Sequence, residues 1–267
     1  MDPLFVIPGF LTAVLVSMTG VGGGALMTPV LILCGVDPVT AVGTDLAYAA
    51  FTKAIAVPLH HQRGNVNWPL VMNMCAGSVP VALLTLWFIN RFGIDDDAYG
   101  QLVTSVLGAA LVLTAVVILL RPRLSESRAS LLAATIFSST TQSVGTLLLT
   151  VLSGATIGLL VTISSVGAGV VGAAILLLIY PKLVTSRIVG TDLAHALILA
   201  GIAAIGYWHR GSVDSGILIP LLIGSVPGVW CGAFFSDRIS GPMLRSIMAT
   251  IMMSVGIGFF IKNLLFT

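Results

Sequence analysis

The sequence predicts an all-α, polytopic membrane protein made of two inverted-topology repeats, and three observations lead to this prediction. The 267-residue chain is 57% hydrophobic and only 8% charged, whereas an ordinary soluble domain carries about a quarter charged residues. Its apolar residues fall into runs near the roughly 20 residues that cross a bilayer as a helix. The same motifs also occur twice, and the two halves place their basic loops differently.

The duplication is carried by motifs that recur after 147 residues, as positions 20 and 167 and positions 43 and 190 show. Several matches at one spacing indicate an internal duplication. We therefore expect a first repeat at residues 1–121, a cytoplasmic connector at 122–144 and a second repeat at 145–267, together one integral membrane unit. The matching motifs are Gly20-Val21-Gly22-Gly23-Gly24 with Gly167-Ala168-Gly169, Gly43-Thr44-Asp45-Leu46-Ala47 with Gly190-Thr191-Asp192-Leu193-Ala194, and Gly77-Ser78-Val79-Pro80 with Gly224-Ser225-Val226-Pro227.

The first half begins with an apolar stretch, Leu4–Gly35, that is interrupted at Thr19–Gly24. Glycines lower helix stability and permit an unwound backbone. We interpret the stretch as two short helices that meet at a glycine turn and form a re-entrant hairpin; a strongly tilted, interrupted single span is the alternative. Three ordinary spans follow, the first opened by an Asp37-Pro38 cap signal, at about Pro38–Leu59, Pro69–Asn90 and Tyr99–Leu120.

The second half repeats this plan after the connector. Within the connector, Leu124–Val144 is richer in Ser and Thr but holds an apolar patch, so we expect a surface helix there. The next stretch, about Thr146–Tyr180, is apolar and is interrupted at Ser164–Gly169. Three spans complete the half, at about Ser186–Tyr207, Ile217–Phe235 and Leu244–Phe260.

Charge placement predicts that the two halves are inverted, because cytoplasmic loops carry an excess of Lys and Arg. A hairpin plus three spans makes an odd number of crossings in each half, which agrees with inversion. Both termini are then periplasmic, and the two hairpins enter from opposite faces, a plan typical of secondary transporters. The basic residues assigned to the cytoplasm are Arg63, Arg121, Arg123 and Arg128 in the first half and Lys182, Arg187, Arg238 and Arg245 in the second.

The two glycine breaks form the predicted substrate site. Each break precedes a short helix, Ala25–Leu33 or Val170–Ile179, whose first N–H groups are unpaired and carry the positive end of the helix dipole. We expect a small oxyanion to bind there. The alternatives are that the glycines only let helices pack closely and that the hydroxyls satisfy backbone freed by the break. The candidate binding residues are Gly20, Gly22, Gly23, Gly24, Ser164, Ser165, Gly167, Gly169, Thr44 and Thr191.

Four ionisable residues inside predicted spans are candidates for coupling or gating. Asp45 and Asp192 each cost about 2.5–3.5 kcal/mol to insert, so each should face a cavity or a partner; capping the neighbouring broken helix is the alternative. His195 lies three residues after Asp192 on the same helix face and could relay a proton, or it is a satisfied core histidine. Lys53 lies on the stripe of Asp45 and could pair with it, attract an anion or snorkel.

Other chemistry is not indicated, and we expect no catalytic residue, metal or cofactor. The three cysteines lie in apolar stretches and should be small buried hydrophobes. The cluster His60-His61-Gln62-Arg63 is more typical of a membrane interface than of a metal site. An intramembrane enzyme is the least favoured function, because neither a nucleophile elbow nor an HExxH motif occurs. The first residues show no cleavable signal peptide.

With these motifs established, the chain resembles the TauE/SafE family of membrane proteins, the sulfite and sulfonate exporters, over essentially its whole length. The motifs that carry the resemblance are Gly20–Gly24, a short helix with Pro29, and Val42–Asp45, repeated as Ser164–Gly169 and Val189–Asp192. The resemblance implies export of sulfite or organosulfonates across the inner (plasma) membrane of bacteria without ATP hydrolysis. The second half departs from the pattern, since Val170-Val171-Gly172 aligns with Gly23-Gly24-Ala25, so the half-sites need not bind equally.

The function favoured by these observations is export of a small anion by alternating access, coupled to an ion gradient. A transporter for another anion and a passive channel that uses the same sites are the alternatives, and uptake fits the sequence as well as export. The expected partners are the anionic substrate, sulfite or a sulfonate, and membrane lipid. Nucleic acid is not expected, because no basic stripe with interleaved aromatic residues occurs, and a homodimer stays open.

Overall fold

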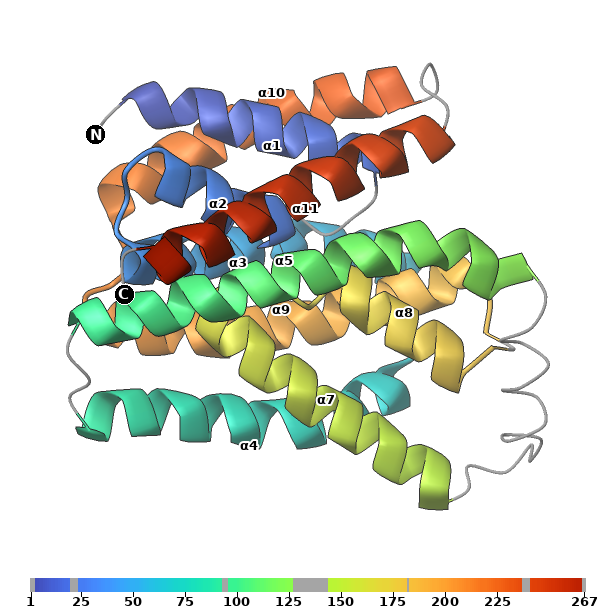
Figure 1. The fold of residues 1–267 in the computed structure, drawn as a ribbon. Coiled ribbons are helices and arrows are strands. Elements are labelled where there is room, and N and C mark those ends of the chain that lie inside the picture. Colours follow the sequence, from blue (N-terminus) through green and yellow to red (C-terminus); the bar gives the residue numbers. More distant parts are fainter. Residues whose placement is uncertain are drawn as a thin grey trace.

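The computed structural model describes residues 3–19, 24–92, 96–126, 144–181, 183–236 and 241–265, and Figure 1 shows them as an elongated bundle. The described residues form helices joined by short loops, with no strand among them, which confirms the predicted all-α class. The surface helix expected in the connector falls on residues 127–143, outside the described residues. The first-half helices are α1 Val6–Thr19, preceded by the 3₁₀ turn Pro3–Phe5, then α2 Gly24–Leu33, α3 Pro38–Gln62, α4 Trp68–Phe92 and α5 Asp96–Glu126; the second-half helices are α7 Val144–Ser164, α8 Val170–Ile179, α9 Thr185–His209, α10 Ser215–Ser236 and α11 Gly241–Leu265.

All six ordinary spans predicted from the sequence are helices, and the largest difference at a helix end is six residues, at the end of α5 (Glu126 rather than Leu120). The cap signal before α3 is also present, because the Asp37 carboxylate accepts hydrogen bonds from the N–H groups of Val39 and Thr40 at 3.0 and 3.1 Å. Within the described residues, five helices are long and apolar enough to cross a membrane. These are Trp68–Arg91, Tyr99–Leu120, Val144–Ser164, Thr185–His209 and Ser215–Gly232. The chain is therefore a polytopic helical membrane protein.

The broken stretches are pairs of helices. In the second half, α7 and α8 are separated by a short non-helical segment and contact each other. Figure 1 shows the outer ends of both helices toward the same side of the bundle, so the chain reverses at this break. Unlike the short arm that we expected, α7 has 21 residues and is long enough to cross a bilayer alone. Its glycines occur singly, and isolated glycines are tolerated within a helix.

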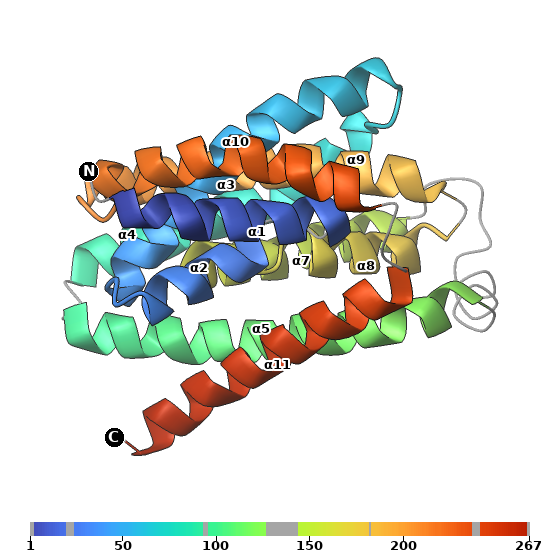
Figure 2. The same ribbon diagram turned by 90° about the horizontal axis from the view of Figure 1, so that it is seen from above.

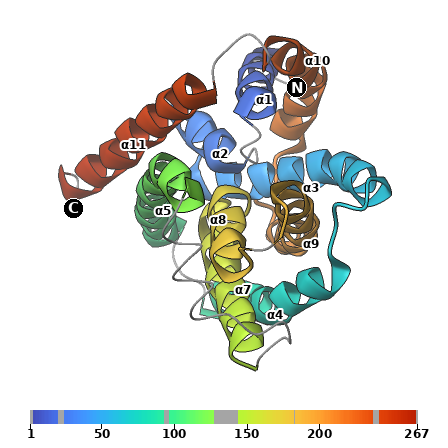
Figure 3. The same cartoon turned by 90° about the vertical axis from the view of Figure 1, so that its right-hand side faces the viewer.

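The largest helix contacts join the two halves. Helix α1 packs against α10, and its counterpart α7 packs against α4, the counterpart of α10. The other two large contacts pair equivalent helices, α3 with α9 and α5 with α11. Seen along the bundle in Figure 3, α3 and α9 lie between the α1–α10 pair and the α4–α7 pair. The apolar core is therefore shared by both halves, and the polar motifs of α3 and α9 lie at its centre.

Glycines allow these close contacts between helices. A side chain at Gly224, Gly228 or Gly232 of α10 would collide with backbone of α1. Figure 2 shows these two helices side by side. In the matching α4–α7 contact, a Cβ atom at Gly154 would meet the Met74 carbonyl, just as one at Gly9 of α1 would meet the Leu221 carbonyl. Small residues at helix contacts let backbones approach closely, so close packing explains these glycines, which lie outside the two breaks.

Candidate functional site

The polar side chains predicted to form the site lie inside the bundle, where α3 crosses α9. Helix α3 positions Thr44, Asp45 and Lys53, and α9 positions the equivalent Thr191 and Asp192 together with His195; each is at most 6% exposed. The side chain of Asp37 caps the first turn of α3, and α9 begins after Val184, whose backbone is extended. The apolar residues of both helices pack into one cluster. Ionisable groups this deeply buried in a membrane protein need specific partners.

Asp45 binds the start of α2 through one carboxylate oxygen. Its Oδ2 atom accepts hydrogen bonds from the backbone N–H of Thr28 at 3.2 Å and from the Thr28 hydroxyl at 2.5 Å. Asp45 therefore contacts the second turn of the neighbouring short helix, α2. Its Oδ1 atom has no hydrogen-bond partner among the described residues, and this oxygen is left for another role. Nothing in the sequence pattern singled out Thr28.

Asp192 and Lys53 belong to the same buried region. The Asp192 carboxylate lies directly against the Cα atom of Gly172 in α8, so that a Cβ atom there would collide with its Oδ1 atom. Lys53 attracts both Asp45 and Asp192 electrostatically. Lys53 thus lies within electrostatic range of both aspartates, one from each half. A low-dielectric interior strengthens such attractions relative to water.

Thr44 and Thr191 bind loops of the opposite half. The Thr44 hydroxyl accepts a hydrogen bond from the N–H of Asp214 at 3.1 Å, and the Thr191 hydroxyl accepts one from the N–H of Asn67 at 3.0 Å. Asn67 and Asp214 are themselves 147 residues apart. The two contacts are therefore equivalent under the duplication, and they tie each polar helix to the loop that precedes α4 or α10.

The second break is a turn with unusual backbone geometry. Ser165 has φ +59°, and the two break glycines, Gly167 and Gly169, have φ +128° and +117°. The Ser164 hydroxyl donates to the Leu160 carbonyl at 2.7 Å and accepts from the Val166 N–H at 3.3 Å, so it satisfies backbone freed by the break. The Ser165 hydroxyl has no hydrogen-bond partner among the described residues.

The start of α2 lies close to the second break. Leu26 near the start of α2 belongs to the same apolar cluster as Val166 and Val170 at the second break. Ser165 also interacts with the Asp45 side chain of the first half. Of the first-break residues, Gly24 begins α2, and Gly20, Gly22 and Gly23 lie outside the described residues. The starts of the two short helices thus lie on either side of the buried aspartates.

His195 and its counterpart Tyr48 each face a serine of the other half. The Nε2 atom of His195 lies 2.8 Å from the Ser78 hydroxyl of α4. Tyr48 interacts in the same way with Ser225 of α10, and both serines belong to the repeated Gly-Ser-Val-Pro motif. The sequence located this motif but not its role, which is to place one hydroxyl of each half beside the polar helix of the other.

A tyrosine pair supports the end of α7. The Tyr99 and Tyr207 hydroxyls are 2.6 Å apart, and the Tyr207 hydroxyl donates to the Thr162 carbonyl at 2.9 Å. Tyr99 therefore donates to Tyr207. The Arg210 guanidinium lies 5.1 Å from the centre of the Tyr99 ring, within the range of a cation–π interaction. Because α7 ends at Ser164, its last carbonyls need partners of this kind.

Replacing Tyr207 with phenylalanine is expected to lower the free energy of unfolding by about 1–3 kcal/mol, because it leaves the Tyr99 hydroxyl and the Thr162 carbonyl without partners. Thermal unfolding of the purified protein in detergent measures this effect. Tyr99→Phe should cost less, since Tyr207 still binds Thr162 in that variant. The double variant should be more stable than the sum of the two losses predicts. Additive losses would show that the hydroxyls do not interact.

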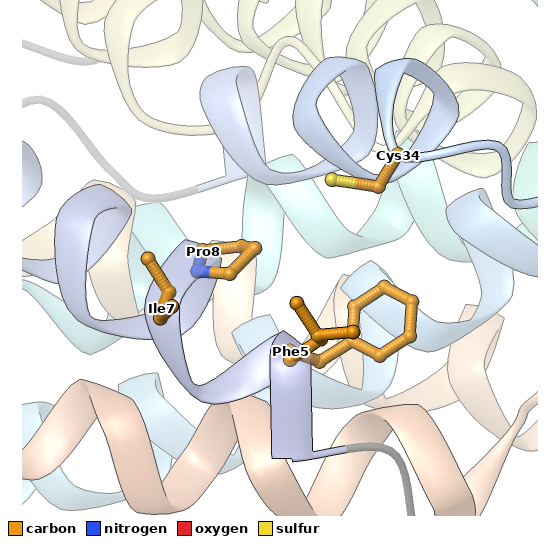
Figure 4. A pocket seen from close by; sticks show the side chains of 5 residues that line it. Phe5, Ile7, Pro8 and Cys34 are labelled. Atoms are coloured by element: carbon orange, nitrogen blue, oxygen red, sulfur yellow. The ribbon is translucent and has the colours of Figure 1, made fainter.

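An apolar pocket lies elsewhere in the fold. It has a volume of about 370 Å³ and is lined by Leu4, Phe5, Ile7, Pro8 and Cys34 (Figure 4). These residues are at the beginning of α1 and just after α2, the ends of that helix pair remote from the break. Cys34 is exposed, unlike the buried hydrophobe that we predicted, because it follows the last residue of α2. None of these five lining residues is charged, and the buried aspartates are not among them.

The buried charges and broken helices inside a multi-pass bundle are features of a membrane transporter. The chain belongs to the TauE/SafE family, because the family profile described as sulfite exporter TauE/SafE matches residues 5–259. It is 34% identical over 261 residues to the probable membrane transporter protein YjnA of Bacillus subtilis (strain 168), covering 96% of this chain and 99% of that protein.

A second relative from the same bacterium, the probable membrane transporter protein YdhB, is 26% identical over 253 residues, covering 91% of this chain and 94% of YdhB. None of the solved structures matches the chain significantly. The relatives extend over nearly the full length of the chain, and with the apolar helices they identify a multi-pass transporter of the bacterial plasma membrane.

Proposed function

We propose that this protein is a secondary transporter that exports a small sulfur oxyanion, sulfite or an organosulfonate, by alternating access. The observation that carries the proposal is the meeting of two similar half-sites. Each consists of a broken helix pair and a buried Thr-Asp motif, and the two motifs lie on the crossing helices α3 and α9. Transporters with inverted repeats place substrate and coupling sites where such broken helices meet.

An inverted arrangement of the halves is supported by the direction of equivalent helices. Figure 1 shows α5 and α11 running in opposite directions, α5 from the left-hand side and α11 toward the left-hand end marked C. The exchange of partners, α1 with α10 and α7 with α4, has the pattern of a two-fold axis between the halves. In a bilayer, these directions would place equivalent loops on opposite faces, in agreement with the distribution of Lys and Arg.

The substrate class follows from the start of α8. Its cap residue, Gly169, has no side chain that could accept from the first N–H groups of the helix, and a helix start offers N–H groups and a positive dipole to an anion. Lys53 adds a buried positive charge between the halves. A compact oxyanion suits these groups, and sulfite is the substrate named in the description of the family. Asp45, Asp192 and His195 would then serve coupling or gating, and no catalytic step is proposed for them.

Burial favours a carrier over a passive channel. The polar side chains of the site that the structure describes are at most 6% exposed, so an anion reaches them only after helices move. A channel would need a continuous wet path. We therefore assign this conformation to an occluded step of the cycle, in which the loops held by Thr44 and Thr191 close the two ends.

Transport by purified protein in liposomes tests the proposal. Vesicles loaded with sulfite, sulfate, thiosulfate or a sulfonate should release sulfite or the sulfonate at least about tenfold faster than empty liposomes, and an imposed ion gradient should drive accumulation. Anion flux that does not depend on any imposed ion gradient would indicate a channel. If none of these anions moves while the protein remains folded and monodisperse, the proposed function is wrong.

A further inference from the structure

The two half-sites differ in the polar groups that surround their aspartates. Thr28, which donates twice to Asp45, corresponds to Ile175 in the second half, 147 residues later. Ser165, which interacts with Asp45, corresponds to Met18 in the first half. Thr28 and Ser165 supply hydroxyls to Asp45, whereas the residues at the two equivalent positions of the duplication are apolar. The duplication has kept both carboxylates but not a hydroxyl at the positions equivalent to Thr28 and Ser165.

The oxygens of Asp45 have different environments. Oδ2 accepts two hydrogen bonds from Thr28, whereas Oδ1 and the nearby Ser165 hydroxyl have no hydrogen-bond partner among the described residues. Both groups are buried, with Asp45 inaccessible to solvent and Ser165 only 5% exposed. A buried polar group without a partner is costly. The Ser165 hydroxyl can pair with Oδ1 in either protonation state, because it can donate to the ionised carboxylate or accept from the carboxyl O–H when Oδ1 carries a proton.

The charges around Asp45 permit both protonation states. On α3 itself, Lys53 and Tyr48 interact electrostatically with Asp45. Across the contact with α9, Asp192 competes for the charge of Lys53, and Tyr207 packs against Gly43. Helix α10 carries no charged residue, α5 contributes Tyr99 near this end of α3, and α2 contributes the neutral hydroxyl of Thr28. Lys53 is thus the one cation found to favour ionised Asp45 among the described groups.

We propose that Asp45 and Ser165 form a proton-binding site, and that this half, not the Asp192 half, carries the coupling ion. The inference rests on the proposed transport function. An O–H bond forms between a proton from water at one membrane face and Oδ1 of Asp45, and it breaks when the site opens to the other face; no electrons are transferred. A hard metal cation takes several oxygen ligands, whereas a proton requires one carrier oxygen and one acceptor, which are present.

The two helix breaks make this site sensitive to conformation. Asp45 is held by α2 through Thr28, and Ser165 belongs to the other half, at the turn before α8. Any motion that separates the two halves at the breaks removes the acceptor from the Asp45 carboxyl group. Protonation therefore stabilises the state in which Ser165 lies beside Asp45, which is how a bound ion shifts a conformational equilibrium.

Infrared difference spectroscopy of the full protein in lipid nanodiscs tests the site without measuring transport. A pH titration should show one buried carboxylic acid band that disappears in Asp45→Asn and persists in the matched Asp192→Asn control. Ser165→Ala should keep the band but shift its frequency, because the hydrogen-bond acceptor is lost. Size-exclusion profiles check folding, and Ser165→Ala with Asp192→Asn decides the question if Asp45→Asn does not fold.

Three results would overturn the site: a band that remains in Asp45→Asn, a band that vanishes in Asp192→Asn, or a band that Ser165→Ala leaves unshifted. In a further experiment, sodium replaces potassium at constant pH. A loss of the band on addition of sodium would identify a metal cation as the ligand instead of a proton. The transport assay separates this proposal from the function on which it rests. Anion flux without an Asp45 band rejects the proton site alone, and an Asp45 band without anion flux rejects the transport function.

Discussion

Replacing Gly228 with valine is expected to lower the free energy of unfolding by about 2–3 kcal/mol, or to prevent stable assembly, because α1 and α10 could no longer approach. A Cβ atom at this position would lie 2.5 Å from the Phe10 carbonyl oxygen and 2.8 Å from the Ala13 side chain. The carbonyl belongs to a helix backbone and cannot rotate away. Since α1–α10 is the largest helix contact in the described structure, its loss should separate the first helix from the rest of the bundle.

Thermal unfolding and size-exclusion profiles in detergent measure this effect. The matched control is Gly258→Val in α11, another glycine within a helix, where an added Cβ atom meets nothing within 4 Å. It should behave like the unmodified protein or be slightly more stable, since glycine is a poor helix former. Equal stability of the two variants would show that the close α1–α10 contact does not exist.

Replacing Gly172 with alanine is expected to reduce transport by about tenfold or more while leaving the fold intact. The added methyl group would occupy the position of Asp192 Oδ1, the end of a flexible side chain. The carboxylate can rotate away without moving a helix, but it then leaves its place between the two halves. Displacement of a functional group by about 1 Å can cost up to about a hundredfold in activity.

Stability and activity should therefore change in opposite directions in this variant, because alanine favours the helix by about 1 kcal/mol over glycine. Liposome flux and thermal unfolding, measured on the same preparation, check both parts. Gly201→Ala in α9 is the control, since open space surrounds that glycine, and it should transport normally. Full activity of Gly172→Ala would mean that the position of the Asp192 carboxylate is unimportant.

Much of the fold could be predicted from the sequence because it depends on local properties. Hydropathy located every ordinary span, with ends within six residues of those observed, and α8 has the limits Val170–Ile179 that were expected for the short helix. The break before it was visible because glycines cost helix stability wherever they occur in numbers. The arm before that break was expected from about Thr146 and is α7 Val144–Ser164, but its 21 residues make it long enough to cross a bilayer alone, unlike the short helix that we expected.

Only part of the candidate site could be predicted from the sequence. Asp45, Asp192 and His195 could be recognised because ionisable residues are rare in apolar spans. Thr28 and the tyrosine pair could not, because threonine and tyrosine are unremarkable in such helices and their partners lie far along the chain. Thr44 and Thr191 illustrate the same limit, since each binds a loop of the opposite half rather than its own.

The sequence by itself determined a polytopic helical protein with a duplicated plan, because insertion into a bilayer depends on hydropathy and length and a duplication is visible in its spacing. Only the tertiary structure decided which helix of one half packs against which helix of the other half. It also distinguished the two aspartates, which are equivalent in their motifs but unlike in their surroundings. The reason is that contacts between distant segments depend on backbone approach and on which side chains meet across it, and a one-dimensional pattern contains neither.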